Sequence, residues 1–236
     1  MYQTTGNYLV IQLMGEEYQK EILGTRRKLL ALREKLERGD VMSDTLDYYN
    51  KNAASFFNNT AEVNMGTIQK KFLSYLPEGS FILDLGCGSG RDTKLFHDNG
   101  YRVEAMDGSE EMCKLAAKET GLQVKHVLFS DFHEENKYDA VWACASILHL
   151  PKNEMKNMLE RIAASLQDKG IFYTSFKYGD YEGEKNGRYF SYYTEETLNE
   201  LLSSVPSLEL LEEWISVDAR KGREDEKWIN VILRKK

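Results

Sequence analysis

The sequence predicts an α/β fold with a doubly wound, mostly parallel sheet that carries helices on both faces. From residue 81 onward, short apolar segments typical of strands alternate with helical patterns, and this alternation indicates a parallel sheet. The first apolar segment runs directly into a glycine-rich turn that opens a helix. The length of 236 residues suits one α/β domain with an appendage, and it suffices to bury a large core without disulfides.

The appendage is predicted at the N-terminus, over residues 1–41. Within it, residues 16–39 carry apolar side chains three or four positions apart with charges of both signs between them, so we expect an amphipathic helix. Such a helix would pack on the surface of its own domain. The alternative is a coiled-coil seam that pairs two copies of the chain as a homodimer, for which the repeat is short. Met42 is an alternative start position.

The remaining elements follow in chain order. One helix begins near Ser43, and a second covers 66–76. Strands are expected over 81–85, 101–106, 124–129, 138–143, 171–176, 208–216 and 228–234. Helices are expected over 91–99, 110–120, 153–166 and 194–203. The last of these begins with a capping box formed by Thr194 and Thr197. Residues 177–186 are rich in glycine, tyrosine and charge and are expected to form a long functional loop.

Composition argues against several classes of protein. Lysine and arginine number 31 against 38 acidic residues, and the net charge of −7 does not fit binding of nucleic acid by bulk charge, although a local basic patch stays open. Cys87, Cys113 and Cys144 form no C-x-x-C pair, so we expect a reducing cytoplasm rather than a zinc ribbon or a disulfide framework. The apolar stretches are far shorter than the ~20 residues that span a bilayer. We therefore expect a cytoplasmic protein with no membrane partner and no bound metal.

The sharpest motif is the glycine turn after residues 81–85. Gly86, Gly88 and Gly90 let the backbone adopt positive φ and approach a ligand closely, and the free N–H groups of the next helix favour a negatively charged group. A phosphate-binding P-loop is excluded because the chain has no Gly-Lys pair, and the dinucleotide fingerprint fails because the third glycine comes one residue early. The nucleoside of S-adenosylmethionine remains as the ligand, with a plain tight turn as the structural alternative.

Residues 84–90, with the sequence DLGCGSG, resemble motif I of the class I S-adenosylmethionine-dependent methyltransferases. The resemblance extends over roughly residues 43–236. It implies a Rossmann-like doubly wound sheet of about seven strands, mostly parallel with an antiparallel C-terminal strand. It also implies S-adenosyl-L-methionine as the cofactor and S-adenosyl-L-homocysteine as the product. Residues 88–92, followed by Gly100 and Tyr101, resemble the small-molecule and tellurite-resistance branch of this family.

Asp107 supplies the second part of the expected cofactor site. It lies 21 residues after Gly86, at the end of the next predicted strand, where a carboxylate can accept two hydrogen bonds from ribose hydroxyls. The resemblance places the following residues around the cofactor: Asp84, Gly86, Cys87, Gly88, Gly90, Arg91, Asp107, Gly108, Ser109, Met112, Phe129, Ser130, Asp131 and Ala143. Tyr49, on the helix that precedes the motif, is expected to cover the cofactor as a lid residue.

Four of these residues have alternative interpretations. Ser130 or Asp131 is expected to meet the adenine amine, and the sequence does not separate the two. Arg91 either reaches the methionine carboxylate, which suits a charged donor, or simply starts the helix. Cys87 is interpreted as a small loop side chain rather than as a redox group.

The acceptor site is predicted in the segment 177–193. Lys177, Arg188, Tyr189 and Tyr192 give this segment an aromatic, partly cationic character that suits a small acceptor, an anionic one included. A solvated loop whose basic side chains pair with nearby carboxylates is the alternative.

No catalytic residue is assigned from the sequence, although two candidates stand out. His149 follows the fourth predicted strand, at the edge of the sheet where ligands bind, and is either a general base or a hydrogen-bonded loop residue. Tyr178 is the second candidate. Because the sulfonium is already activated, positioning and exclusion of water could carry most of the catalysis.

The predicted function is transfer of a methyl group from S-adenosylmethionine to an O, N or S nucleophile of a small molecule. The chain has no Pro-Pro pair and no Pro-Cys pair, which argues against base-modifying enzymes of nucleic acids. Methylation of protein or RNA, a non-catalytic S-adenosylmethionine-binding module and an enzyme such as a lyase stay open. The methyltransferase domain is expected over 42–236, with a cofactor half over about 66–150 and a substrate cap from 43–65 and 177–193.

Overall fold

The computed structural model describes residues 40–236, of which residues 44–236 form one compact unit. The helix expected over 16–39, and the dimer seam that it could form, lie outside the described residues. The described helices are α3 (Asp40–Thr60), α4 (Gly66–Leu73), α5 (Arg91–Asp98), α6 (Glu110–Thr120), α7 (Lys152–Ser165) and α8 (Glu195–Ser203). Two short 3-10 turns, η1 (Phe129–Asp131) and η2 (Ile147–His149), follow the third and fourth strands.

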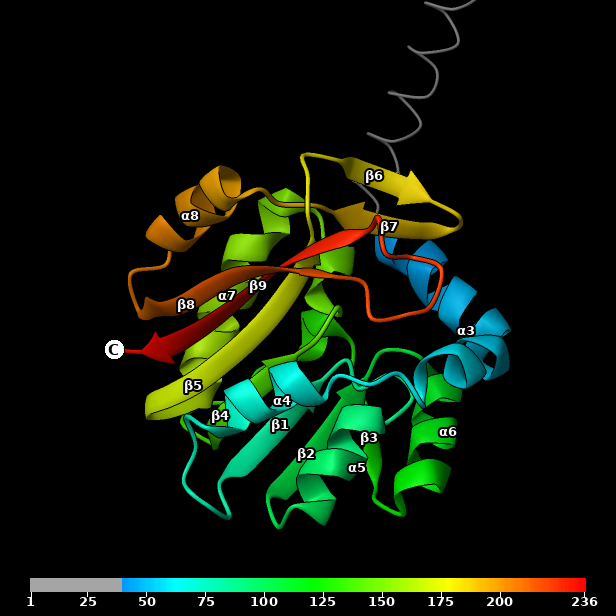
Figure 1. Ribbon diagram of the computed structural model, residues 1–236, viewed down its shortest axis with the longest axis horizontal. Helices are drawn as coiled ribbons and strands as arrows, with labels where there is room; N and C mark the ends of the chain where they lie inside the picture. The colour runs from blue at the N-terminus through cyan, green and yellow to red at the C-terminus, as the bar shows by residue number, and fades with distance from the viewer. Residues whose placement is uncertain (1–39) are drawn as a thin grey trace, which may run out of the picture. The chain divides into compact units, whose positions relative to one another are not determined.

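A seven-stranded sheet forms the centre of the compact unit, as Figure 1 shows. Its strands are β1 (Phe81–Leu85), β2 (Arg102–Asp107), β3 (Val124–His126), β4 (Tyr138–Ala143), β5 (Leu166–Lys177), β8 (Leu208–Val217) and β9 (Lys227–Lys235). They lie in the order β3-β2-β1-β4-β5-β9-β8. β1 to β5 pair in parallel, whereas β9 pairs antiparallel with both β5 and β8. This arrangement confirms the predicted fold class, including the antiparallel strand at the C-terminus.

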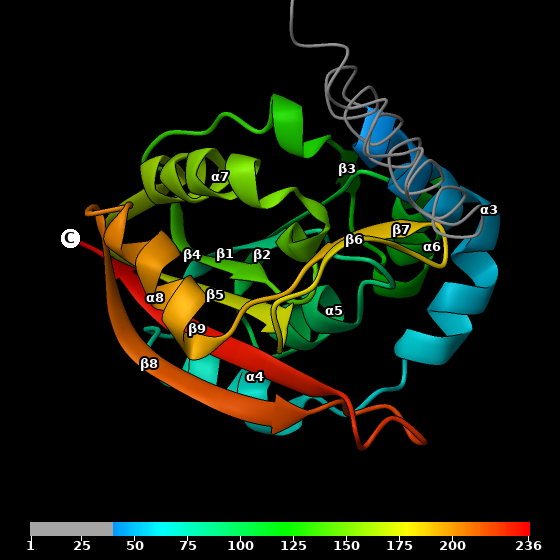
Figure 2. The same ribbon diagram turned by 90° about the horizontal axis from the view of Figure 1, so that it is seen from above.

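Helices cover both faces of the sheet. Figure 2 shows α7 on one side of β4, β1 and β2, with α4 and α5 on the other side. On the second side, Phe72 of α4 and Phe96 of α5 pack against the fully buried Trp142 and Tyr173, whose rings stack with centroids 4.0 Å apart. Because alternate strand residues point to opposite faces, each strand can bury side chains under both helical layers.

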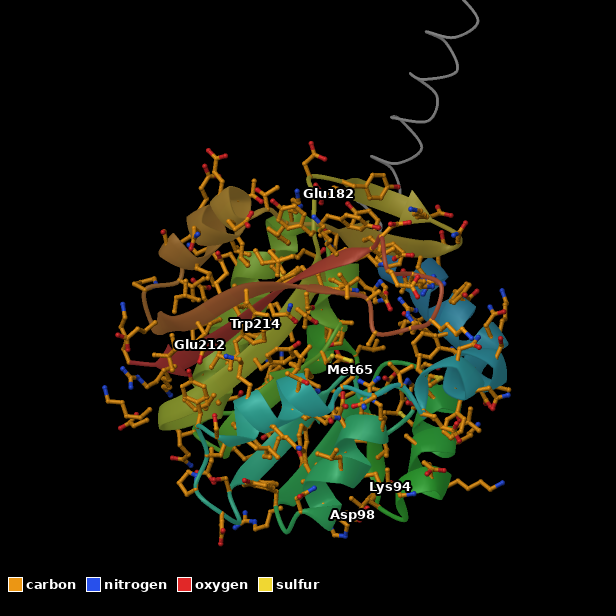
Figure 3. All side chains as sticks on the ribbon, viewed as in Figure 1. Met65, Lys94, Asp98, Glu182, Glu212 and Trp214 are labelled. Atoms are coloured by element: carbon orange, nitrogen blue, oxygen red, sulfur yellow. The ribbon has the colours of Figure 1, made fainter. Side chains whose placement is uncertain are left out.

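The antiparallel end of the sheet is fixed to α4 through Glu212 on β8. The carboxylate of Glu212 accepts hydrogen bonds from the side chains of Lys71 and Tyr75. The Lys71 ammonium also lies 5.1 Å from the ring centroid of Trp214, which neighbours Glu212 in Figure 3. These contacts hold β8 against the helix that leads into the glycine turn.

Two helix starts agree with their sequence signals. The side chain of Ser109 caps α6 by accepting a hydrogen bond from the N–H of Met112. Thr194 and Thr197 form the predicted capping box at the start of α8, with each side chain bonded to the backbone of the other residue.

The structure corrects three of the expected elements. Residues 177–186 are not one long loop, because β6 (Glu182–Lys185) and β7 (Arg188–Ser191) form a hairpin closed by Asn186 and Gly187, both at positive φ. β5 begins at Leu166 rather than at residue 171, because Leu166 directly follows α7 and already pairs with Tyr138 of β4. β3 ends at His126, three residues before its predicted end.

Candidate functional site

The glycine turn after β1 lies against the ends of β2 and β4. Gly86 and Cys87 donate backbone hydrogen bonds of 2.8 and 2.9 Å to the carbonyl of Met106, the residue before the last of β2. Gly86 has φ of 78°, and a Cβ built on it would lie 2.4 Å from Cβ of Ser146, which follows β4. Glycine is therefore required at residue 86 by both backbone conformation and space.

Asp107 joins the end of β2 to the glycine turn. Its Oδ2 accepts the N–H of Gly88 at 2.9 Å, and its Oδ1 accepts the N–H of Ser109 at 2.8 Å. Burial raises the pKa of the carboxyl, and the two backbone donors oppose that shift. The structure thus brings Asp107 and the turn together, as the spacing predicted, and each carboxylate oxygen retains a lone pair for a further donor.

Asp84 is buried beneath the turn. It accepts a hydrogen bond of 2.6 Å from the hydroxyl of Thr93 on α5. Burial, with a contribution from the nearby Asp92 carboxylate, raises the pKa of Asp84 to about 8. Its contact supports a structural role, in which it ties the last part of β1 to the helix that follows the turn.

Arg91 pairs with the next residue, Asp92. Its Nε and Nη2 each lie 2.8 Å from a carboxylate oxygen of Asp92, which also accepts from Gln69 and Trp142. Burial opposes ionisation of Asp92, but the Arg91 charge and these donors hold its pKa below the usual range. The guanidinium of Arg91 is therefore already engaged within α5.

Helix α3 covers the ends of β1 and β2. Asn50 accepts a hydrogen bond of 2.7 Å from the hydroxyl of Ser109. The side chain of Leu46 lies over Gly108, where a Cβ would approach it to 2.8 Å, and Phe56 lies 3.6 Å from the Cβ position of Gly88. Asn50, Leu46 and Phe56 lie in the segment 43–65 that was expected to form part of the cap, but the sequence does not single them out, because their helical spacing is equally typical of core packing.

Tyr49 reaches from α3 to His149 in η2. The Tyr49 hydroxyl lies 2.8 Å from Nε2 of His149, and Nδ1 of His149 lies 2.6 Å from the carbonyl of Tyr189 on β7. Burial lowers the pKa of His149 to about 4, so the ring is neutral at neutral pH. The structure places both expected residues together and engages both nitrogens of the imidazole.

The remaining cofactor candidates surround the same strand ends. Met112 and Ala143 are buried, and the carbonyl of Ala143 accepts the hydroxyl of Thr174 at 3.1 Å. Cys87 is buried, and burial raises the pKa of its thiol well above the usual range, so it is not a thiolate. Gly90, with φ of 78°, caps the N-terminus of α5.

The residues after β3 form the η1 turn. Its carbonyls at Phe129 and Ser130 accept hydrogen bonds of 2.7 and 3.1 Å from Arg161 on α7. The Ser130 hydroxyl donates to the neighbouring Asp131 carboxylate, and both side chains are exposed. The structure leaves both available as expected and does not separate them.

The acceptor-site candidates divide into two groups. Arg188 lies 4.5 Å from the ring of Tyr48, beside the lid helix. Tyr189 is buried and tied to α3 through its N–H, which donates to Thr45 at 2.9 Å. Lys177 lies elsewhere, paired with Glu226 and 3.8 Å from Asp218.

The other two tyrosines have partners of their own. The exposed Tyr178 donates to Glu195 at 2.8 Å, at the start of α8, so the structure does not bring it to His149. Tyr192 packs edge-on against Tyr181 and Phe190.

The architecture is a Rossmann-like α/β fold, with a glycine turn after β1 and a carboxylate at the end of β2. Residues 82–170 match the family described as "Methyltransferase domain". An uncharacterized methyltransferase of Staphylococcus carnosus is 25% identical over 134 residues, which cover 54% of this chain and 65% of that protein. The chain spans less than two thirds of the curated relatives it matches, with 65%, 49% and 46% of their lengths covered.

Solved structures share the fold. The 1,6-didemethyltoxoflavin-N1-methyltransferase of Burkholderia thailandensis, with bound 1,6-didemethyltoxoflavin and S-adenosylhomocysteine, gives a TM-score of 0.67 at 24% identity, covering 84% of this chain and 89% of that one. A TehB-like methyltransferase of Corynebacterium glutamicum gives a TM-score of 0.61 at 18% identity, covering 80% and 100%. The chain thus matches a methyltransferase domain family over residues 82–170 and shares its fold with these solved methyltransferases.

Within residues 40–236, no three His, Cys, Asp or Glu side chains come together in a group that could hold a metal ion. None of the described helices is long and apolar enough to cross a membrane.

Proposed function

We propose that the protein binds S-adenosylmethionine at the glycine turn and transfers its methyl group to a small molecule. The observation that carries this proposal is the Asp107 carboxylate, which is held against Gly88 at the end of β2. The match of residues 82–170 to a methyltransferase domain family favours S-adenosylmethionine over other nucleosides as the cofactor. The bound 1,6-didemethyltoxoflavin in the Burkholderia structure supports a small acceptor.

The residues around the turn fit this cofactor. Asp107 uses one lone pair on each oxygen for backbone donors, and the others can accept the two ribose hydroxyls. The missing Cβ of Gly86 lets the turn pack against Ser146, and Gly88 lies beneath Phe56 of the lid helix, so the turn presents its backbone at the strand ends. Gly108, Ser109 and Met112 would line the adenine side, and Ser130 or Asp131 would meet the adenine amine.

The cofactor would supply a methyl group on a positively charged sulfur: an O, N or S nucleophile would bond to the methyl carbon in line as the carbon–sulfur bond breaks and its electron pair returns to sulfur. The chain's own residues orient the reactants and exclude water. Tyr49 and His149 act together in this role, because their hydrogen bond fixes the lid helix over the strand ends. His149 is neutral, and its Nε2 is already bonded to the Tyr49 hydroxyl. We therefore assign His149 a positioning role rather than that of a general base.

We also propose that residues 42–236 form the methyltransferase domain, with the substrate cap drawn from 43–65 and 177–193. The hydrogen bond between Thr45 and Tyr189 supports this cap, because it joins its two segments at 2.9 Å. Cys87, Cys113 and Cys144 are free thiols, which supports the cytoplasm as the compartment.

Calorimetric titration with S-adenosylhomocysteine tests the cofactor proposal without needing the acceptor. We expect one binding site per chain. Absence of binding by the folded protein would contradict the proposal. Binding with no methyl transfer to any cellular fraction would instead favour a non-catalytic module.

A further inference from the structure

A cavity of about 610 Å³ lies between the lid helix α3 and the loop that joins β8 to β9. Figure 1 shows the elements that border it, α3 and the turn before β9. Residues 48–64 supply one wall, residues 219–223 supply another, and Arg188 enters from β7. The sequence gives no sign of this cavity, because its walls come from three distant segments.

The walls carry an excess of positive charge. Arg188, Arg220, Lys221 and Arg223 line the cavity, against the single carboxylate of Glu62. This local excess contrasts with the net charge of −7 for the whole chain. A concave surface lined by charges of one sign attracts a ligand of the opposite sign.

Two of these cations are neutralised within the protein and two are not. Arg220 pairs with the buried Asp218 at 2.5 Å, and Arg223 lies 3.3 Å from Glu226. In the described part of the chain, no carboxylate lies within ion-pair distance of Arg188 or Lys221. The unpaired charges are thus the ones that a ligand can meet.

Arg188 is held in place by aromatic rings rather than by an anion. Its guanidinium carbon lies 4.5 Å from the ring centroid of Tyr48 and 5.1 Å from that of Phe190. Its Nε is buried and has no hydrogen-bond partner within the described residues. Stacking fixes the planar guanidinium and leaves its buried Nε without a partner, which suits binding of a carboxylate or a phosphate.

The cavity adjoins the glycine turn. Phe56 lines the cavity and lies 3.6 Å from the Cβ position of Gly88. Arg188 also lies 5.9 Å from the ring of Tyr49, the residue that contacts His149. A molecule held by Arg188 would therefore lie one side chain away from the proposed cofactor.

We propose that this cavity binds an anionic group of the methyl acceptor, a carboxylate or a phosphate, through Arg188 and Lys221. The inference rests on the proposed function and narrows its substrate to anionic small molecules, with Tyr48 and Phe56 as apolar walls for the rest of the acceptor. The methionine part of the cofactor also carries a carboxylate that Arg188 could bind. The test therefore distinguishes an anionic group on the acceptor from the carboxylate of the cofactor.

The test uses benzoate and its uncharged isostere benzamide as probes, titrated by ligand-observed NMR into the full chain with saturating S-adenosylhomocysteine. We expect benzoate to bind at least tenfold more tightly than benzamide, and inorganic phosphate to compete with it. Arg188→Gln should abolish the preference. Lys221→Gln, on an exposed loop, should weaken benzoate at least threefold without affecting folding. Lys185→Gln removes the same charge from the neighbouring strand β6, outside the cavity, and should change nothing.

Each contrary result has a distinct meaning. Equal binding of benzoate and benzamide to the wild type would overturn the inference. A tenfold loss of S-adenosylhomocysteine affinity in Arg188→Gln, measured in a separate titration, would assign the guanidinium to the cofactor's carboxylate and would also overturn it. Failure of S-adenosylhomocysteine to bind the wild type would instead contradict the proposed function, and the probe titration without it would still decide whether the cavity prefers anions.

Discussion

The hydroxyl of Tyr49 donates a hydrogen bond to Nε2 of His149, across 100 residues of sequence. The direction follows from the other ring nitrogen, since Nδ1 lies 2.6 Å from the Tyr189 carbonyl, which can only accept, and so carries the proton. Nε2 of the neutral ring is then an acceptor. One buried imidazole thereby connects the lid helix α3, the η2 turn and the β6–β7 hairpin.

Tyr49→Phe should lower the free energy of unfolding by about 1–3 kcal/mol, because it leaves a buried ring nitrogen without a partner. The change should also weaken S-adenosylhomocysteine binding, since the lid helix loses its fixed position. Urea denaturation and calorimetry measure the two effects.

Tyr48→Phe is the matched control for that substitution. Tyr48 is the adjacent residue, and its hydroxyl makes no hydrogen bond in the described part of the chain, so removal should cost less than about 0.5 kcal/mol. Equal stability losses in the two variants would show that the contact with His149 is not what fixes the helix.

Asp107→Ala should reduce S-adenosylmethionine affinity by about 100-fold while the protein stays folded, because it removes two hydrogen bonds to a charged acceptor. Asp98→Ala, an exposed carboxylate at the end of α5, should leave affinity unchanged. Calorimetry on both variants provides the comparison, and wild-type affinity in Asp107→Ala would remove this residue from the site.

Gly86→Ala should destabilise the protein more than Gly79→Ala does. Both glycines have similar positive φ, 78° and 74°, so each substitution incurs the left-handed penalty of about 1–2 kcal/mol. Only the Cβ at residue 86 meets another atom, Ser146 Cβ at 2.4 Å, whereas nothing lies within 4 Å at residue 79.

The added cost at residue 86 should be about 1–3 kcal/mol in thermal or urea unfolding. Ser146→Gly should restore part of it in the double variant, because it removes the Cβ that clashes. No rescue would mean that the strain arises from the backbone alone.

Asp84→Asn should change the pH dependence of stability. The folded protein raises the pKa of Asp84 to about 8, so between about pH 4 and pH 8 it retains a proton that the unfolded chain releases. Wild-type stability therefore falls with rising pH through this window, and the asparagine variant lacks that contribution. The stability of the variant relative to wild type should rise steadily from about pH 4 to pH 8 in urea titrations, and parallel curves would refute the assignment.

The sequence predicts the cofactor half of the fold well because its signals are contiguous. An apolar strand, three glycines and a carboxylate at fixed spacing lie within 27 residues, from Phe81 to Asp107. The β6–β7 hairpin was missed despite the Asn186-Gly187 pair, because β6 reads Glu-Gly-Glu-Lys and lacks the apolar alternation of a half-buried strand. Here tertiary contacts, such as that of Thr45 with Tyr189, stabilise a hairpin that its own composition does not favour.

The acceptor side of the site could not be predicted in the same way. Arg188 was expected there from its loop composition, but its aromatic platform depends on Tyr48, 140 residues earlier in the chain. Arg220 and Lys221 belong to a segment whose charges nearly cancel in the sequence. The ion pairs that Asp218 and Glu226 form in the folded protein show that, among the described residues, Arg220 is neutralised whereas Lys221 is not. Partners that meet only through folding leave no periodic signal.

The most direct measurement is methyl transfer itself. The protein would be incubated with methyl-labelled S-adenosylmethionine and a cytosolic extract, and the products would be separated by size and then by anion exchange. We expect label in small molecules that are retained on the anion-exchange column, and none with Asp107→Ala. Label confined to protein or RNA would contradict the proposed function.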